Sequence, residues 1–341
     1  MARVSSTTDL ATQLLAWFAR ERRDLPWREE PRDPYRVWLS EVMLQQTRVD
    51  VVLPYFARFV QRFPTVQDLA RAPLGDVLAL WSGLGYYSRA RNLHAAAQQL
   101  ARDFPRTAAG LARLPGFGPY TSAAVASLAF GEDVPLVDGN VARVLSRVLR
   151  LEGDARARSW EAAAALLPRG KAGAFNEALM ELGALVCAPR APRCGACPLE
   201  RSCLGKDEPD RFPARAVKKP RQRLDWQAVA LVRRDGAVLL SQRPAGALFA
   251  GLWDLPPAVE LAALRPGPVA LGPLEPRGEV RQTLTHREVR VEILAGRAQG
   301  RAPAGLRWVK PGDLGALGLS SLAVKCLRAA GIKTPARPSL S

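Results

Sequence analysis

Apolar side chains in the first part of the chain recur at the spacing of one helix face. Over residues 8–205 they repeat every three or four positions, and Pro and Gly residues separate one stretch from the next. Three such stripes are formed by Val49, Val52, Leu53, Phe56 and Val60, by Val141, Val144, Leu145 and Val148, and by Phe175, Leu179, Leu182 and Val186. This pattern predicts that residues 8–205 are mostly helical.

The pattern changes after Trp226, where apolar residues alternate with polar ones or form short runs. Turn signals such as Asp235-Gly236 separate these runs, which are Ala228–Val232, Ala237–Leu240 and Val289–Leu294. We therefore predict a second, smaller α+β domain that contains a sheet. Residues 211–223 carry six basic and no acidic side chains and two prolines, which is typical of a linker. The expected organisation is a helical region over 1–210, a linker over 211–225, a second domain over 226–332 and a tail over 333–341.

Length and charge agree with two domains and a polyanionic partner. The chain has 341 residues, a net charge of +17 and a pI of about 10.6. Such a surplus indicates nucleic acid as the partner, although a proteome rich in arginine would also produce it. We find neither a secretory signal nor an apolar run of about 18 residues, so we expect no membrane span and a cytoplasmic location.

Four of the five cysteines lie within one short segment, at Cys187, Cys194, Cys197 and Cys203. Four thiolates can complete a tetrahedral metal site or hold one corner each of a cubane iron–sulfur cluster. Zinc sites more often use two close Cys-x2-Cys pairs, so the uneven spacing favours a [4Fe–4S] cluster. Zinc and disulfides remain the alternatives.

A glycine pair and one aspartate can be interpreted from local structure alone. Gly116 and Gly118 lie between two helical stretches, where glycines allow a tight turn and leave amides free to bind a phosphate. Taken by itself, the glycine pair would indicate an ordinary turn. Asp138 comes directly before an apolar stripe, so it is a candidate N-cap, and the helix N-terminus is expected to lower its pKa.

Together the glycine hairpin, the segment Val137-Asp138-Gly139-Asn140-Val141 and the cysteine run resemble the endonuclease III superfamily of DNA glycosylases. Three N-terminal segments are similar to the adenine DNA glycosylases of the MutY type, namely Leu25-Pro26-Trp27-Arg28, residues 37–47 (VWLSEVMLQQT) and residues 83–93 (GLGYYSRARNL). Residues 226–330 resemble the C-terminal Nudix-like module of that family.

The resemblance implies a multidomain fold, with an all-α helix-hairpin-helix glycosylase region that holds the iron–sulfur cluster, followed by an α+β Nudix-like domain. It also implies a monofunctional enzyme of base excision repair. The enzyme would remove adenine mispaired with 8-oxoguanine or guanine from double-stranded DNA, and we expect it to act as a monomer. Two rivals are a sister glycosylase that removes thymine from G·T mismatches and a non-catalytic DNA-binding protein with a redox-sensing cluster.

Breaking an N-glycosidic bond builds positive charge on the sugar, so it needs an acid on the base and an anion near the sugar. The resemblance assigns these roles to Glu41 and Asp138. The neighbours of Glu41 are apolar, which is expected to raise its pKa and keep it protonated; alone, it would be a surface residue of an amphipathic helix. Tyr120 stands where bifunctional members carry a lysine that attacks the sugar. We therefore expect hydrolysis by water without an efficient lyase step.

The resemblance also implies the substrate contacts. The adenine pocket would be lined by Trp27, Arg28, Leu44, Tyr120 and Glu177, and Gln46 and Tyr86 would wedge into the duplex. The DNA backbone would be contacted by Gly116, Gly118 and Asn140, and 8-oxoguanine would be recognised by Thr285 and His286. The simpler alternatives are a solvated acidic pair for Glu177 and Glu181, core packing for Tyr86 and a loop role for His286. Leu284 replaces an aromatic residue of the family's lesion-reading loop. Glu260 is the only glutamate where the Nudix box needs several, so we expect no diphosphate hydrolysis.

Overall fold

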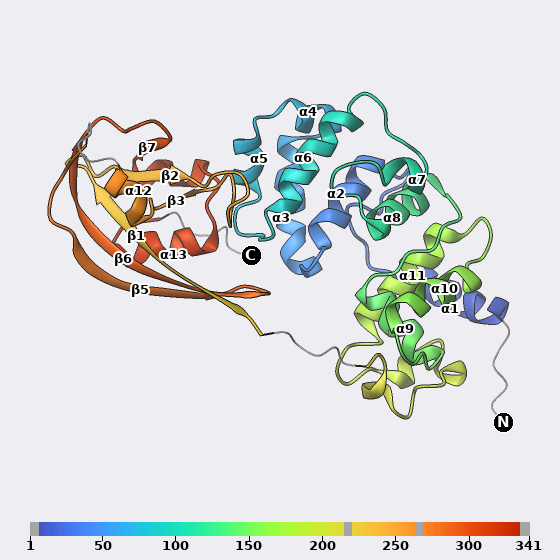
Figure 1. Cartoon of the computed structure of the whole chain (residues 1–341). Helices are drawn as coiled ribbons and strands as arrows, with labels where there is room; N and C mark the ends of the chain where they lie inside the picture. Colours follow the sequence, from blue (N-terminus) through green and yellow to red (C-terminus); the bar gives the residue numbers. More distant parts are fainter. Residues whose placement is uncertain (1–6, 215–219, 264–268, 335–341) are drawn as a thin grey trace. The chain divides into compact units, whose positions relative to one another are not determined.

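The computed structural model describes residues 7–214, 220–263 and 269–334. Residues 215–219 of the expected linker and 335–341 of the expected tail lie outside the described residues. Contacts divide the chain into two units, one made of Met1–Gln46 with Ala96–Val217 and the other of Thr47–Ala95 with Lys218–Ser341. Figure 1 shows the elements of both units.

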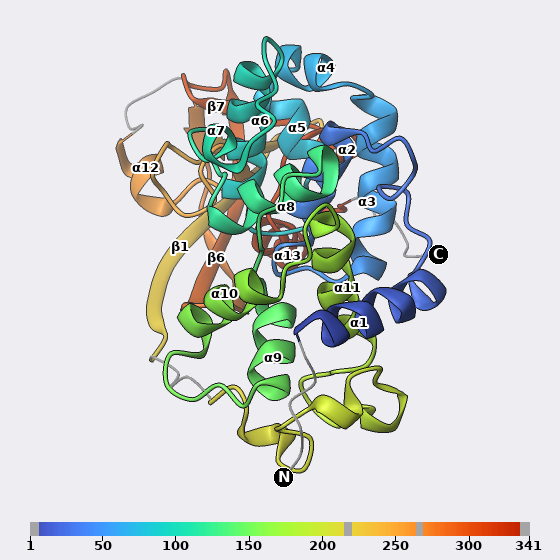
Figure 2. The ribbon, with the colours of Figure 1, turned by 90° about the vertical axis from the view of Figure 1, so that its right-hand side faces the viewer.

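The first unit is helical in its described part, as the apolar stripes predict. Helix α11 contacts α1, α8 and α9, while α2 and α7 pack on α8 and α10 packs on α9 and α1; Figure 2 shows this group. The helices are α1 (Thr7–Glu21), α2 (Pro34–Leu44), α7 (Ala108–Leu111), α8 (Pro119–Phe130), α9 (Gly139–Val148), α10 (Ala155–Leu166) and α11 (Ala172–Leu185). Three short 3-10 turns follow, η1 (Cys194–Ala196), η2 (Glu200–Ser202) and η3 (Pro209–Arg211).

Gly183 allows the close packing of α9 on α11. A Cβ at this position would lie 2.5 Å from the Cβ of Asn140, a distance that real side chains do not reach. Apolar residues of α9 and α11, including Val144 and Leu182, share one buried cluster next to this contact. The close approach fixes the N-terminus of α9, and hence Asp138, beside α11.

The second unit combines helices with a mixed sheet. The helices and turns are α3 (Val49–Arg62), α4 (Val66–Arg71), α5 (Leu74–Leu80), most of α6 (Ser88–Leu100), α12 (Ala258–Ala263), η4 (Pro311–Ala316) and α13 (Ser321–Ala329). The strands are β1 (Gln222–Val232), β2 (Val238–Gln242), β3 (Trp253–Asp254), β4 (Val269–Leu271), β5 (Glu275–Thr283), β6 (Arg287–Gly300) and β7 (Leu306–Val309).

The sheet runs in the order β3-β2-β1-β6-β4, with β5 paired to β6 and β7 paired to β2. Strands β1 and β6 are parallel, with Gln222 opposite Arg287, and the other pairs are antiparallel. Alternate residues of β1 face opposite sides: Ala228 lies in a cluster with residues of α13, and Val229 in one with Leu261 of α12. The prediction of an α+β domain is confirmed, and β1 begins at Gln222, before the expected boundary at residue 226.

None of the helices in the described ranges is long and apolar enough to cross a membrane.

Candidate active site

Glu41 lies on the buried side of α2 and is hydrogen-bonded to a residue of α8. Tyr120, in the first turn of α8, donates a hydrogen bond from its hydroxyl to Oε2 of Glu41. The same hydroxyl lies 3.3 Å from Sδ of Met180 on α11. Glu41 is only 4% exposed, so the alternative of a surface glutamate is wrong.

Burial raises the pKa of Glu41 to about 7, as expected from its apolar neighbours. The hydrogen bond from Tyr120 opposes the shift, the charges of Asp138 and Glu177 add to it, and Arg28 opposes it. A carboxyl group with this pKa is about half protonated at neutral pH, so it can donate and later accept a proton there.

Asp138 is the N-cap of α9, which confirms the prediction from its position. Its Oδ1 accepts a hydrogen bond from the amide of Val141 at 2.7 Å, and its Oδ2 accepts one from Nδ2 of Asn140 at 3.0 Å. The expected lowering of its pKa is wrong: burial raises the pKa, and these donors together with Arg143 only partly oppose the shift. Its charge acts on both Glu41 and Tyr120, so the three groups form one site.

Glu177 and Glu181 on α11 are 4% and 1% exposed, so the alternative of a solvated acidic pair is wrong. Arg28 donates from Nε to Oε1 of Glu177 at 3.1 Å and from Nη2 to Oε2 of Glu181 at 3.1 Å. Arg23 and Arg32 join these bonds from the segment between α1 and α2. Sequence reasoning missed both arginines and Met180. The run of charged residues around Leu25-Pro26-Trp27-Arg28 was the one available signal for the arginines.

The remaining predicted residues of the first unit lie around these groups in different ways. Trp27 is buried, and Leu44 is half-buried at the end of α2. Gln46 follows α2, is exposed and has a φ of 59°, a left-handed conformation that is uncommon outside glycine. Gly116 needs its glycine for a φ of 78°, whereas Gly118 has a φ of −78° that any residue can adopt. The expectation that both glycines permit the tight turn is therefore right for Gly116 and wrong for Gly118.

The four cysteines line one cavity together with Arg147 of α9. Arg147 is 3% exposed and donates to the carbonyls of Ala188, at 2.7 Å, and Pro189, at 3.3 Å, while its Nη1 lies 3.4 Å from Sγ of Cys187. One turn earlier, Arg143 donates to the carbonyl of Cys187 at 2.8 Å and to Oδ1 of Asn140 at 2.8 Å. Helix α9 therefore joins the Asp138 cap to the cysteine segment.

In the part of the chain that the structure describes, no group of three or more His, Cys, Asp or Glu side chains is placed to hold a metal ion.

Two predicted residues of the second unit are in direct contact. The hydroxyl oxygens of Tyr86 and Thr285 lie 2.8 Å apart. Tyr86 is 46% exposed and has a φ of 49°, so the alternative of core packing is wrong. Thr285 and His286 are exposed in the turn between β5 and β6, which is closed by a bond from the amide of Leu284 to the carbonyl of Arg287.

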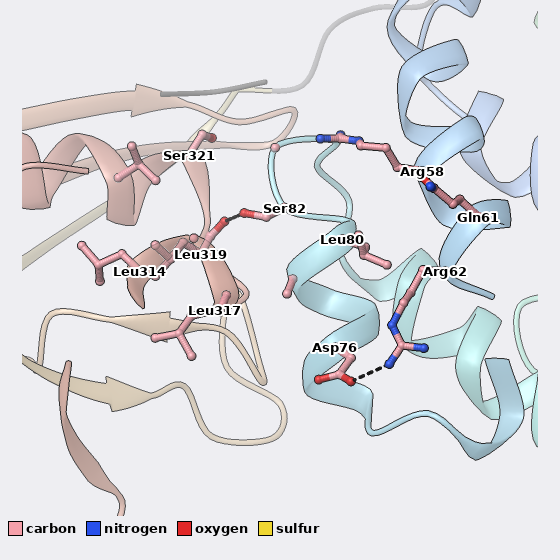
Figure 3. A pocket seen from close by; sticks show the side chains of 15 residues that line it. Arg58, Gln61, Arg62, Asp76, Leu80, Ser82, Leu314, Leu317, Leu319 and Ser321 are labelled. Atoms are coloured by element: carbon pink, nitrogen blue, oxygen red, sulfur yellow. Dashed lines mark hydrogen bonds and ion pairs between the residues drawn. The ribbon is translucent and has the colours of Figure 1, made fainter. Parts of the chain in front are cut away.

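The second unit also contains a cavity of about 840 Å³ between α3, α5 and the segment around η4 (Figure 3). Arg58 and Arg62 lie on one wall, Leu314 and Leu317 lie on the other, and Arg62 is 3.5 Å from Asp76. The residues that line it include none of the predicted catalytic or binding residues. Ser82 donates to the carbonyl of Leu319 at 2.6 Å, and Tyr87 donates to the same carbonyl at 3.0 Å.

Comparison with known proteins gives the family. Residues 39–169 match the model of the HhH-GPD superfamily base excision DNA repair proteins, and residues 228–329 match the NUDIX domain. Adenine DNA glycosylase of Homo sapiens is 35% identical over 95% of this chain and 74% of its own length. The Rattus norvegicus enzyme of that name is 34% identical over 90% of this chain and 75% of its own length.

Solved structures agree with the fold of the helical part. A thermostable thymine-DNA glycosylase is 31% identical with a TM-score of 0.54, and it covers 59% of this chain and 96% of its own. A non-covalent endonuclease III–DNA complex is 22% identical with a TM-score of 0.51 and shares the fold. It covers 59% of this chain and 95% of its own.

The adenine DNA glycosylases extend the similarity through both parts of the chain, whereas the thymine-DNA glycosylase matches little more than half of it. The alternative of a non-catalytic DNA-binding protein finds no support among these relatives. The chain belongs to the family of adenine DNA glycosylases, with a helix-hairpin-helix glycosylase region followed by a Nudix-like domain.

Proposed function

We propose that the protein hydrolyses the N-glycosidic bond of adenine mispaired with 8-oxoguanine or guanine in double-stranded DNA. It would act as a monomer on chromosomal DNA in the cytoplasm and leave an abasic site for base excision repair. The observation that carries this proposal is the buried Glu41, whose pKa is raised to about 7, in one site with Tyr120 and Asp138.

The reaction needs the adenine outside the base stack, where Glu41 can reach it. Protonated Glu41 gives its proton to a ring nitrogen of adenine, and the bond to C1′ breaks with its electron pair leaving on the base. The resulting positive charge on the sugar is stabilised by the carboxylate of Asp138. Water then attacks C1′, and the Glu41 carboxylate takes the proton that this water releases. Adenine and an abasic site result, and Glu41 is protonated again.

Asp138 suits the anionic role because its oxygens accept bonds from two N–H donors, the Val141 amide and the Asn140 side chain. Burial raises the pKa of Tyr120 well above its usual range, so this residue stays a neutral hydroxyl donor to Glu41. Tyr120 has no amine with which to form a Schiff base. We therefore propose that the enzyme is monofunctional.

The substrate contacts complete the proposal. Trp27, Arg28, Leu44 and Glu177 would line the adenine pocket with Tyr120, while Gly116, Gly118 and Asn140 would contact the DNA backbone. Gln46 and Tyr86 would enter the duplex, and this use fits two exposed side chains with left-handed backbones. Thr285 and His286 would read 8-oxoguanine from the turn between β5 and β6.

We propose that Cys187, Cys194, Cys197 and Cys203 hold a [4Fe–4S] cluster. The donor set fits, because all four thiols line one cavity and Arg147 lies beside one of them. Once bound, the cluster would cross-link the segment of residues 187–203. The guanidinium groups of Arg143 and Arg147, already bound to that segment, would fix its position relative to Asp138.

A single-turnover assay on duplexes with A·8-oxoG, A·G, T·G and A·T pairs tests the function. We expect the wild type to release adenine from the first two and to leave T·G and A·T nearly intact. Glu41→Gln should lose roughly 10²-fold or more in rate, because it cannot donate the proton, and should still bind the duplex. Release of thymine from T·G, or strong covalent trapping of the wild type by borohydride, would contradict the proposal.

A further inference from the structure

Five charged side chains of the first unit form one alternating chain beside the proposed adenine pocket. They connect the segment between α1 and α2 to α11, in the order Arg23, Glu181, Arg28, Glu177 and Arg32. At the end of the chain, Nε of Arg32 also binds Oε1 of the exposed Glu30 at 2.7 Å, so the three positive charges are matched by three negative ones. The two glutamates of α11 are one helical turn apart, so a sequence pattern alone makes them equivalent.

Glu181 has no acceptor capacity left. Its Oε1 accepts from the amide and Nε of Arg23, at 2.8 and 2.9 Å, and from Nη1 of Arg28 at 3.3 Å. Its Oε2 accepts from Nη2 of Arg23 at 2.8 Å and from Nη2 of Arg28 at 3.1 Å. Although burial opposes ionisation, these bonds lower the pKa of Glu181 to about 2. Glu181 is therefore a permanent anion that binds two guanidinium groups.

Glu177 is different, because its acceptors are not all used. Its Oε1 accepts from Nε of Arg28 and from Nη1 of Arg32, both at 3.1 Å. Its Oε2 accepts one bond in the described residues, from Nη2 of Arg32 at 2.9 Å. A carboxylate oxygen can accept two such bonds. This oxygen can therefore accept a further donor, such as the exocyclic amine of adenine.

Arg28 is held on two sides and acts on the catalytic acid. Its Nη1 also donates to the carbonyl of Arg23 at 3.0 Å, so Arg23 binds both Glu181 and Arg28. The groups whose charge or hydrogen bond acts on Glu41 are Tyr120 from α8, Asp138 from before α9, Glu177 from α11 and Arg28 from the segment before α2. A displaced Arg28 would change both the pocket wall and the charge next to Glu41.

We infer that Glu181 is a positioning residue, which together with Arg23 fixes Arg28 so that Glu177 keeps a free acceptor toward the flipped adenine. The inference rests on the proposed function, since it needs adenine in this pocket. Glu181 and Arg23 do not touch the base themselves. They determine the geometry and the charge around Arg28 and Glu177, the two groups that would contact the base.

Glu181→Gln tests the inference in the full-length protein. The neutral amide binds the two guanidiniums more weakly, so we expect the single-turnover excision rate to fall roughly 10²-fold, with duplex affinity changed far less. The charge of Arg28 lowers the pKa of Glu41, so a displaced Arg28 should raise that pKa. The pH at which the rate falls should therefore move upward. A purely structural role would lower the fraction of active protein and leave that pH unchanged.

Two companion variants keep the test decisive. Glu29→Gln removes the same charge from the exposed Glu29–Arg36 pair, whose atoms are 2.9 Å apart, and should keep the wild-type rate and pH profile. Arg23→Met leaves the Glu181–Arg28 bonds in place and is expected to fold even if Glu181→Gln does not. It should cost roughly 3- to 10-fold in rate.

The inference is overturned if folded Glu181→Gln or Arg23→Met protein excises adenine at the wild-type rate. It is also overturned if Glu181→Gln protein is slow with an unchanged pH profile. If the wild type itself does not excise adenine, the proposed function fails instead, so the two failures are distinguishable.

Discussion

Buried carboxyl groups of the first unit show how donors decide a protonation state. Glu41 accepts one hydrogen bond from Tyr120, and burial raises its pKa to about 7. Glu181 is as deeply buried, but five N–H donors from two arginines lower its pKa to about 2. The difference follows from the number of donors around each carboxylate and from the positive charge of the two guanidinium groups beside Glu181. One acid can therefore donate a proton at neutral pH while the other holds a fixed charge.

The pH dependence of excision tests the role of Glu41 as the acid. Its protonated form predominates below its pKa, so the single-turnover rate should fall as the pH rises through about 7. The rate should also fall in acid, where Asp138 is protonated and loses the charge that the sugar cation needs. Tyr120→Phe removes a hydrogen bond that lowers the pKa of Glu41, so the fall near pH 7 should move to higher pH. The measurement is the rate at closely spaced pH values for both proteins, with circular dichroism as the control for folding. A fall that moves to lower pH would contradict the assignment.

Local sequence explains some of these residues and leaves others unexplained. The raised pKa of Glu41 was predictable because its helix neighbours are apolar. The raised pKa of Asp138 was not predictable, because it comes from burial, and burial depends on packing between elements that are distant in the sequence. The close approach of Gly183 in α11 to Asn140 in α9 is an example of such packing. Arg23 and Glu181 are 158 positions apart, so no local pattern could pair them.

At the scale of elements, α9 connects the reaction centre to the cysteine segment. Asp138 caps its N-terminus, and Arg143 and Arg147 bind backbone carbonyls of the segment that carries the cysteines. The apolar stripe on α9 predicted the helix and its buried face. It did not predict a buried Arg147, because arginine is rarely buried without partners and its carbonyl partners come from distant loops.

The variant Asp138→Asn tests the helix N-cap and the negative charge of Asp138 separately. Asparagine is as good an N-cap as aspartate, so α9 should be preserved. Burial raises the pKa of Asp138, which means that its ionisation costs stability at neutral pH, and the neutral variant should be as stable or more so. Excision should fall by roughly 10²- to 10³-fold, because the developing sugar cation loses its anion.

Thermal unfolding and single-turnover rates at neutral pH measure the two effects separately. A large loss of stability in Asp138→Asn protein would show that the carboxylate is needed for the fold. Wild-type excision by the variant would show that its charge is not needed for the reaction.

At the scale of the whole molecule, the chain passes between its two units more than once. Residues 47–95 group with the C-terminal residues, and Ser82 and Tyr87 donate to the carbonyl of Leu319. A Cβ on Gly318 would lie 3.0 Å from the Cβ of Leu78, so the two segments pack closely. The sequence predicted the helices and the sheet but not this grouping, because contacts between distant segments leave no periodic signal. Tyr86 and Thr285 thus share one unit, while Glu41 and Asp138 belong to the other.

This division leads to a prediction about lesion preference. A Thr285→Ala, His286→Ala double variant removes the polar side chains from the exposed turn between β5 and β6 and leaves the catalytic carboxyls unchanged. We expect the preference for A·8-oxoG over A·G to fall roughly tenfold, the loss of about one hydrogen bond, with little change in the rate on A·G. The measurement is the ratio of single-turnover rates on the two duplexes.

Two controls show which contact matters. Thr283→Ala changes an exposed threonine at the end of β5 and should keep the wild-type ratio. Tyr86→Phe breaks the 2.8 Å contact with Thr285 but keeps the ring, so it shows how much of any effect comes from freeing Tyr86. If the double variant keeps the full preference, 8-oxoguanine is read elsewhere. If it slows A·G and A·8-oxoG equally, the turn serves DNA binding in general, because a residue that reads the lesion must discriminate between the two duplexes.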